Sequence, residues 1–171
     1  MRHAWIGLAA FAAVGLVATR VEAQVKIGVV DLQRALQSVN DGKKAKEKLE
    51  AEVKKRQKSF DKMQDDVKKL KDELEKQISV MSEDVKRKKL EEYQRKLMEV
   101  QDYYLNNQRE LAEMEAQLTR PILDRFHRIL QEIGAKEKYT VILDRQAAVY
   151  WEAGTDLTDR LIQEYNAGKG K

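Results

Sequence analysis

The sequence predicts a mainly α-helical protein in which a long antiparallel coiled-coil hairpin is inserted into a small α/β body. Three observations predict this architecture. Charged residues make up 36% of the 171-residue chain and aromatic residues only 6%, which suits solvated helices with a narrow apolar seam better than one compact domain. Apolar residues in the middle of the chain recur at intervals of three and four. Short β-branched runs lie near both ends.

The first 23 residues are typical of a secretory signal peptide. Arg2 supplies the positive charge, residues 5–18 form an uncharged run, and Val21 and Ala23 are the small residues of a cleavage site. A transmembrane helix needs about 20 apolar residues, so a retained membrane anchor is the less favoured alternative. We therefore expect cleavage after Ala23 and a mature protein that acts outside the cytoplasm.

Residues 24–42 are expected to form the first part of the body. Lys26–Val30 is a short β-branched strand candidate. Asp31 follows it and is a good N-cap for a helix over Leu32–Val39. The Asn40–Gly42 sequence is typical of a turn. This order leads the chain from the body into the hairpin.

Residues 43–118 are expected to form the hairpin arm. Residues 43–81 hold no glycine or proline and consist largely of strong helix formers. Ser82 and the two acidic residues after it are typical of a new helix start, which places the tip near residues 79–84. Two long helices joined by so short a break fold back on each other. Their seams consist of Leu49, Val53, Phe60, Met63, Val67, Leu70, Leu74 and Ile78, and of Leu90, Tyr93, Leu97, Val100, Tyr104, Asn107, Leu111, Met114 and Leu118.

Polar residues interrupt both seams partway along the arm. If facing residues have numbers that add to about 162, Arg56 and Gln57 fall at nearly the same height as Asn107. Two interpretations remain open. The three residues form a weak layer where the arm bends, or they form a polar set that fixes the register of the two helices.

Residues 119–171 are expected to complete the body. Pro121 lies at a bend or in the first turn of a new helical segment. This segment has a wider apolar face than the arm, and Gly134 is its expected C-cap.

Two further strands and a last helix are expected near the C-terminus. Tyr139–Leu143 and Ala147–Trp151 have strand composition, and a three-residue connection joins them in hairpin fashion. Asp156 is expected to cap a helix over Leu157–Tyr165. The Gly168–Lys171 tail is expected to be frayed.

Such a body is small and would expose the edges of its three short strands. Oligomerisation through the body is the simplest physical remedy. The candidate oligomer core consists of Val29, Val141, Leu143 and Val149.

Charge is distributed unevenly along the mature chain. Residues 43–98 hold 19 Lys and Arg against 13 Asp and Glu, a net charge of +6, whereas residues 99–171 have a net charge of −3. Basic arms would attract acidic chains. The cluster of Lys86, Arg87, Lys88 and Lys89 at the tip is a candidate patch for such chains, or for anionic lipid or lipopolysaccharide headgroups. The alternative is an ordinary solvated helix surface.

The sequence offers no catalytic constellation, and we expect no enzyme, cofactor or metal site. His127 is the one histidine of the mature chain, and the chain has no H-E-x-x-H motif, Gly-rich phosphate loop or nucleophile elbow. The absence of cysteine excludes a disulfide framework. Nucleic-acid binding is disfavoured because acidic residues are interleaved with the lysines.

The chain resembles the Skp/OmpH family of periplasmic chaperones. The resemblance rests on KIGVVDLQRAL at Lys26–Leu36, the Lys/Glu/Gln-rich hairpin, YTVILDRQAAVYW at Tyr139–Trp151 and TDLTDRLI at Thr155–Ile162. One departure is Lys138, because members often carry glycine just before the strand tyrosine.

This resemblance implies a jellyfish-like homotrimer whose bodies share a β-barrel-like core and whose three arms surround a cavity. It also implies ATP-independent holding of unfolded outer-membrane β-barrel proteins in the periplasm. The alternative function is a structural coiled-coil spacer of the cell envelope without chaperone activity.

Overall fold

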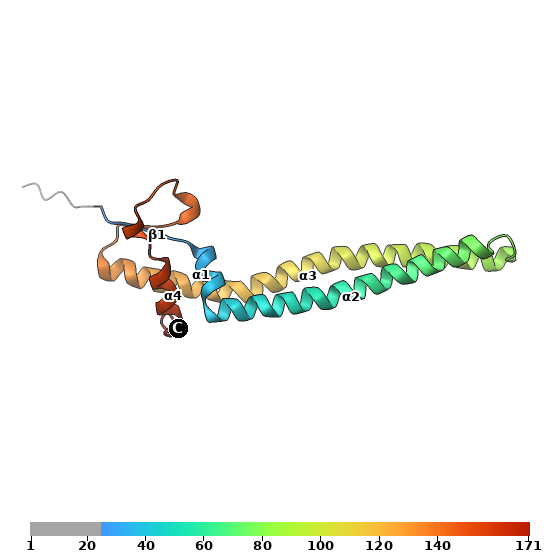
Figure 1. The fold of residues 1–171 in the computed structure, drawn as a ribbon, viewed down its shortest axis with the longest axis horizontal. Helices are drawn as coiled ribbons and strands as arrows, with labels where there is room; N and C mark the ends of the chain where they lie inside the picture. Colours follow the sequence, from blue (N-terminus) through green and yellow to red (C-terminus); the bar gives the residue numbers. More distant parts are fainter. Residues whose placement is uncertain (1–24) are drawn as a thin grey trace, which may run out of the picture.

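The computed structural model describes residues 25–171, so the predicted signal peptide lies outside the described residues. The described chain is mainly helical with a small two-stranded sheet, which confirms the predicted class. Two long helices extend from a small body at one end of the molecule (Figure 1). None of the helices in residues 25–171 has an apolar stretch long enough to cross a membrane.

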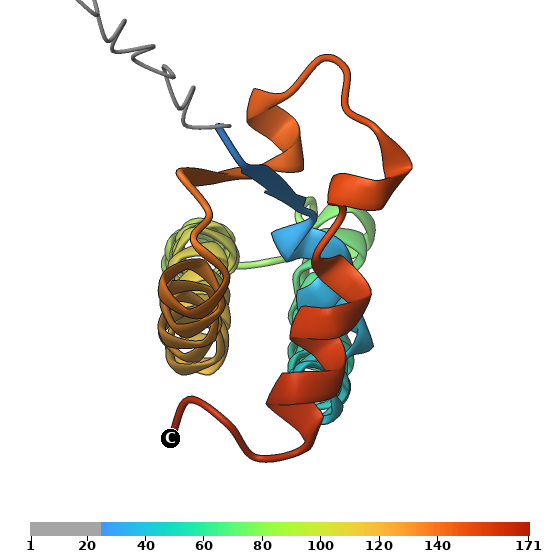
Figure 2. The same ribbon diagram turned by 90° about the vertical axis from the view of Figure 1, so that its left-hand side faces the viewer.

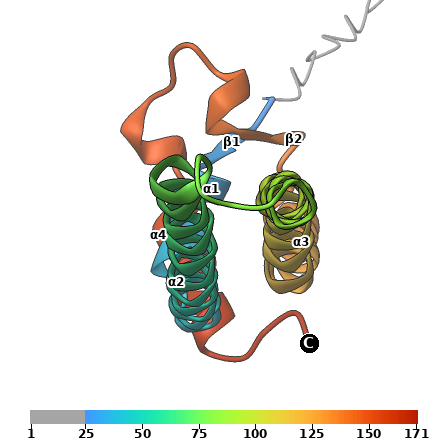
Figure 3. The same cartoon turned by 90° about the vertical axis from the view of Figure 1, so that its right-hand side faces the viewer.

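The body begins with strand β1, Ile27–Val30, which pairs in parallel with β2, Val141–Asp144. Helix α1, Leu32–Ser38, follows immediately. Its start is fixed as predicted, because the Asp31 carboxylate accepts a hydrogen bond of 2.8 Å from the Arg34 backbone N–H. Viewed along the arm, the sheet lies to one side of two helical columns (Figures 2 and 3).

The predicted turn at Asn40–Gly42 is wrong, because these residues form the first turn of helix α2, Asn40–Gln77. The chain changes direction one residue earlier, at Val39, whose backbone is extended. Gly42 lies directly against the end of α1: a Cβ atom there would stand 1.7 Å from the Leu36 carbonyl oxygen. Glycine is therefore needed here for a close approach between two helices rather than for a turn.

Helix α3 runs without interruption from Glu83 to Glu137, so no new segment begins at Pro121. Pro121 is exposed on this helix. Proline has no N–H, so the carbonyl four residues before it lacks its helical hydrogen bond and can bind water instead. Gly134 is not the C-cap as expected. The cap is Lys138, in the left-handed conformation with φ of 58°, and the Gly134 carbonyl accepts the Tyr139 N–H at 3.0 Å.

Replacing Lys138 with glycine is expected to stabilise the protein by about 0.5–1 kcal/mol, because only glycine adopts the left-handed conformation without a Cβ penalty. Urea unfolding followed by circular dichroism measures the change. Lys136→Gly is the matched control: it removes the same charge from the last turn of α3 and is expected to destabilise by about 1 kcal/mol. Equal shifts in the two variants would contradict the left-handed cap.

The predicted strand over Ala147–Trp151 is also wrong for the single chain. A short 3₁₀ turn, η1, covers Arg145–Ala147 and a second, η2, covers Ala153–Thr155. The Asp144 carboxylate accepts the Gln146 N–H at 2.7 Å and turns the chain away from the sheet. The alternating apolar pattern of this segment has no neighbouring strand to pair with in the described chain.

The last helix, α4, spans Thr158–Asn166, within a residue of the expected bounds. It packs beside α1 and α3, and the Thr158 hydroxyl accepts the Asp31 N–H at 2.9 Å. This places segments from both ends of the described chain in one hydrophobic core. The buried core cluster consists of Val30, Ala35, Val39, Ile122, Phe126, Ile129, Leu130, Ile133, Leu157, Leu161 and Tyr165.

The expectation of a frayed tail at Gly168–Lys171 is wrong. The buried Arg125 side chain donates hydrogen bonds to the carbonyls of Tyr165 and Lys169. Arg128 donates to the Gly170 carbonyl at 2.8 Å. These arginines on α3 bind backbone carbonyls at the end of α4 and in the segment after it, and so hold the tail against the core.

Candidate functional site

The arm consists of α2 and the facing part of α3, which lie side by side and run in opposite directions (Figures 1 and 3). The Lys89 ammonium on α3 lies 3.3 Å from the Glu73 carboxylate on α2. Farther from the tip, the Phe60 ring stacks on Tyr103 with centroids 6.5 Å apart. Both contacts agree with the predicted register to within one residue.

The arm buries very few of its apolar side chains. Of its seam residues only Leu70 and Leu74 are buried, and the others are half-buried or exposed. Two helices alone cover one face of each other, so apolar side chains at the edges of the seam stay in solvent. The large hydrophobic residues exposed on the arm are Val53, Ile78, Val80, Val85, Leu90, Leu97, Met98, Tyr104 and Leu105.

The predicted polar layer is present in part. Arg56 donates from Nε to the Glu52 carboxylate and from Nη1 to the Asn107 amide oxygen, both at 2.8 Å, and also pairs with Glu110. The Arg56 side chain is only 18% exposed, so these partners satisfy a largely buried charge. Gln57 lies outside this cluster, because its amide donates to the Asp61 carboxylate on its own helix at 2.7 Å.

Pairing within this cluster shifts the pKa values of Arg56 and Glu52. Hydrogen bonds to Glu110 and Glu52 raise the pKa of Arg56, and the hydrogen bond from Arg56 lowers the pKa of Glu52. These are the contacts that a register-fixing set requires, whereas bending at this layer stays a prediction. The two glutamates were not predicted from the sequence. Their spacing was the available signal, because Glu52 lies four residues before Arg56 and Glu110 three residues after Asn107.

The basic cluster at the tip lies on the first turns of α3. Three of its members have acidic neighbours: Lys86 lies 3.9 Å from Glu83, Arg87 lies 3.0 Å from Asp84, and Lys89 pairs with Glu73. Lys88 is exposed, and no ion pair of it occurs within residues 25–171. The local field of the tip is therefore weaker than four unpaired charges would produce.

The four candidate residues of the oligomer core have different environments. Val29 is only 3% exposed, and its carbonyl accepts the Leu157 N–H at 2.7 Å, so it packs within its own chain. Leu143 is half-buried. Val141 is 39% exposed and Val149 is fully exposed. Ile27, the pairing partner of Val141, is exposed as well, so one end of the sheet presents apolar side chains to solvent.

A long two-helix arm on a small α/β body is also the architecture of a known family. The family model described as outer membrane protein (OmpH-like) matches residues 26–165. This chain belongs to the OmpH-like family. The match covers the body and the whole arm, so it does not rest on the helical pattern alone.

One protein of similar sequence and one solved structure of similar fold can be compared with this OmpH-like chain. An uncharacterised protein of Aquifex aeolicus (strain VF5) is 25% identical over 135 residues, which are 79% of this chain and 82% of that protein. A crystal structure from Caulobacter crescentus CB15, provisionally described as an OmpH-like outer membrane chaperone, has a TM-score of 0.72. It is 18% identical and covers 85% of this chain and 86% of its own, so the two proteins share a fold.

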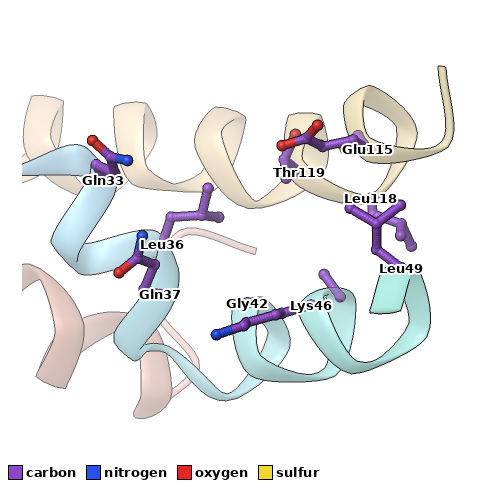
Figure 4. Close-up of a pocket in the computed structure, with 10 residues that line it drawn as sticks. Gln33, Leu36, Gln37, Gly42, Lys46, Leu49, Glu115, Leu118 and Thr119 are labelled. Carbon is purple, nitrogen blue, oxygen red and sulfur yellow. The ribbon is translucent and has the colours of Figure 1, made fainter. Parts of the chain in front are cut away.

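A small cavity lies where the arm of this OmpH-like chain meets the body. Its volume is about 220 Å³, and residues of α1, α2 and α3 line it (Figure 4). Leu36, Leu49 and Leu118 are apolar residues of this lining, and Lys46 and Glu115 are its only charged residues. Gly42 and Ala45, two small residues in the first turns of α2, also line the cavity. It holds no pair of titratable groups suited to acid–base chemistry.

Three titratable groups in the body of the OmpH-like chain have pKa values shifted by structural contacts or burial. A backbone hydrogen bond from Arg34 lowers the pKa of Asp31, hydrogen bonding from Arg160 lowers the pKa of Glu137, and burial raises the pKa of Tyr165. His127 is exposed. Within residues 25–171, no group of three His, Asp or Glu residues is placed to hold a metal ion.

Proposed function

We propose that this protein is an ATP-independent holdase chaperone that binds unfolded outer-membrane β-barrel proteins in the periplasm and prevents their aggregation. Membership of the OmpH-like family and the shared fold support a chaperone role. The observation that carries the proposal is that the arm leaves large apolar side chains exposed along its length, whereas the body buries a hydrophobic core. We expect the chain to have no catalytic activity.

The arm combines the two properties that weak, tolerant binding of unfolded chains needs. Its net positive charge steers acidic chains toward it. Exposed Leu, Met, Val and Tyr side chains then offer many small apolar contacts that tolerate different sequences. Many weak contacts acting together hold a client strongly. Because each contact is weak, the contacts can break one at a time, and the client is then released.

We further propose that the functional form is a homotrimer whose bodies join through the exposed end of the sheet. Ile27 and Val141 are exposed there, Val149 and Tyr150 are exposed in the segment that follows β2, and the outer edge of β2 has no strand beside it in the described chain. Such an edge and such a patch are covered in a stable assembly. In the trimer, residues 147–151 would gain the neighbouring strand that the single chain lacks, and three arms would enclose the client.

The test is dilution of a urea-unfolded outer-membrane barrel protein into buffer that contains residues 24–171 of this chain. Light scattering follows aggregation of the client. The proposal predicts that scattering falls to the level of buffer when the chaperone trimer equals the client in concentration, with or without ATP. Undiminished scattering at a molar excess of the chain would defeat the proposal and favour the structural spacer.

A second proposed role for the tip is binding of anionic headgroups, in lipid or lipopolysaccharide. The tip bears Lys86, Arg87, Lys88 and Lys89 at the far end of the arm, next to the highly exposed Val80. A basic residue near an anionic surface contributes about 1 kcal/mol. Partial pairing with acidic neighbours lowers that value for three of the four.

Replacing all four basic tip residues with glutamine is expected to lower co-sedimentation with anionic lipid vesicles by about tenfold or more. The matched control replaces four lysines of α2 with glutamine: Lys54, Lys58, Lys62 and Lys69. It changes the net charge by the same amount, at positions outside the tip. Vesicles of neutral lipid should bind neither protein. Unchanged binding of the tip variant to anionic vesicles would sink the lipid role.

A further inference from the structure

Two apolar side chains midway along α3 lie outside the seam that joins the arm helices. Met98 is 62% exposed and Leu105 is 51% exposed. Each of them directly follows a seam residue, Leu97 and Tyr104, and is therefore turned about 100° from the seam around the helix. The hairpin does not need these side chains for its own packing, so their apolar character needs another explanation.

Met98 and Leu105 belong to a stripe that carries no charge. Residues 94, 98, 101, 105 and 108 are spaced by four, three, four and three, so they lie on one face of α3. We name these residues the neutral stripe. The residues around the neutral stripe are rich in Lys, Arg, Asp and Glu. The stripe itself consists of exposed, uncharged residues: Gln94, Met98, Gln101, Leu105 and Gln108.

The two edges of the arm differ in chemistry. Each residue of the neutral stripe follows a seam residue, whereas Lys96, Glu99 and Glu110 each precede one and lie on the opposite side. On that opposite edge, Lys96 pairs with Glu99 at 3.2 Å and Glu110 joins the Arg56 cluster. Charged side chains and ion pairs thus line this edge of α3, whereas the five residues of the neutral stripe carry no charge.

Neighbouring seam residues widen the neutral edge. Tyr104 is 50% exposed and its ring lies 5.9 Å from Phe60 on α2, and Leu97 is 43% exposed. The stripe spans about 21 Å from residue 94 to residue 108. An extended chain covers that length with about six residues.

We propose that the neutral stripe, with Leu97 and Tyr104, is the surface on which the arm holds uncharged, apolar-rich segments of an unfolded client. This inference rests on the proposed chaperone function and specifies its contact surface. Charge selects the occupant, because an acidic segment finds no ion-pair partner on the stripe and an uncharged segment loses no charge hydration there. Glutamine amides can bind the unpaired backbone groups of an unfolded segment, and the Met98 thioether adapts to varied side chains.

The variant Met98→Lys/Leu105→Lys tests the proposal in the client dilution experiment. Its predicted effect is that at least tenfold more protein is needed to halve client scattering. The added positive charges make the test strict, since capture by electrostatics alone would be unchanged or stronger. The control Ser59→Lys/Asn106→Lys adds the same charge at exposed polar positions that each precede a seam residue, on the opposite edge, and is expected to stay within twofold of the unsubstituted protein. Circular dichroism of each variant verifies its helices.

The outcomes separate the two proposals. If the unsubstituted protein fails to suppress scattering, the chaperone function itself is wrong. If it suppresses scattering and Met98→Lys/Leu105→Lys does so equally well, the function stands and the neutral stripe is overturned.

Cross-linking identifies the occupant directly. The variant Met98→benzoylphenylalanine, irradiated with the client, should attach to uncharged apolar segments of the client that peptide mapping identifies. Attachment to a second copy of this chain, with the client absent from the products, would show an interface between copies and would overturn the proposal.

Discussion

Replacing Gly42 with alanine is expected to destabilise the protein by about 3 kcal/mol or more. An added Cβ would stand 1.7 Å from the Leu36 carbonyl oxygen and 2.9 Å from its carbon, and backbone atoms cannot move aside without separating α1 from α2. The sign is informative. Within a helix, alanine is favoured over glycine by about 1 kcal/mol, so intrinsic propensity alone predicts stabilisation.

Urea unfolding followed by circular dichroism measures this effect. Gly154→Ala is the matched control, because no atom lies within 4 Å of the Cβ it would add, and its change is expected to stay within about 0.5 kcal/mol. A Gly42→Ala protein as stable as the unsubstituted one would contradict the close approach of α1 and α2.

Replacing Phe126 with alanine is expected to cost about 3–5 kcal/mol of unfolding free energy. The Phe126 side chain has no exposed surface and packs edge-on against Tyr165, with ring centroids 5.2 Å apart. Tyr165 in turn donates a hydrogen bond of 2.9 Å to Asp41 at the start of α2. The cavity left by the substitution would therefore lie where α3, α4 and the base of the arm meet.

Two further variants calibrate the measurement. Phe126→Leu keeps most of the volume and is expected to cost about 1–1.5 kcal/mol. Phe60→Ala removes the same ring from a half-buried place on the arm, where solvent already reaches it, and is expected to cost less than Phe126→Ala. A loss at Phe126 no greater than the loss at Phe60 would contradict a core concentrated in the body.

Features that depend on neighbours in the sequence could be predicted well. The Asp31 cap, the two arm helices and the register of Phe60 against Tyr103 follow from local spacing and propensity, and the structure agrees with them. Such patterns repeat over many turns, so a single unusual residue does not hide them. The family resemblance was also readable, because the strand motifs near both ends carry it.

Features that depend on distant contacts could not be predicted from the sequence. The Asn40–Gly42 segment has the composition of a turn, and the need for glycine at position 42 is explained only by the close approach of the Leu36 carbonyl. Residues 147–151 alternate like a strand, but strand formation needs a neighbour, which the described single chain lacks. Val29 and Val141 look alike in the sequence, yet Val29 is buried and its carbonyl accepts the Leu157 N–H, while Val141 is exposed.

The candidate site shows the same division. Sequence placed Arg56 and Asn107 at one height, and the structure joins them, but it gives Gln57 a partner on its own helix. The distinction between seam residues and exposed apolar residues needed side-chain positions, because both classes use Leu, Met, Val and Tyr. Exposure separates Met98 and Leu105 from buried Leu70 and Leu74.

Native mass spectrometry of residues 24–171 mixed with an unfolded outer-membrane barrel protein detects client binding and the oligomeric state in one experiment. We expect one complex that contains three copies of this chain and one client molecule, and that forms without ATP. Unbound client beside single copies of the chain would contradict both the trimer and the chaperone function.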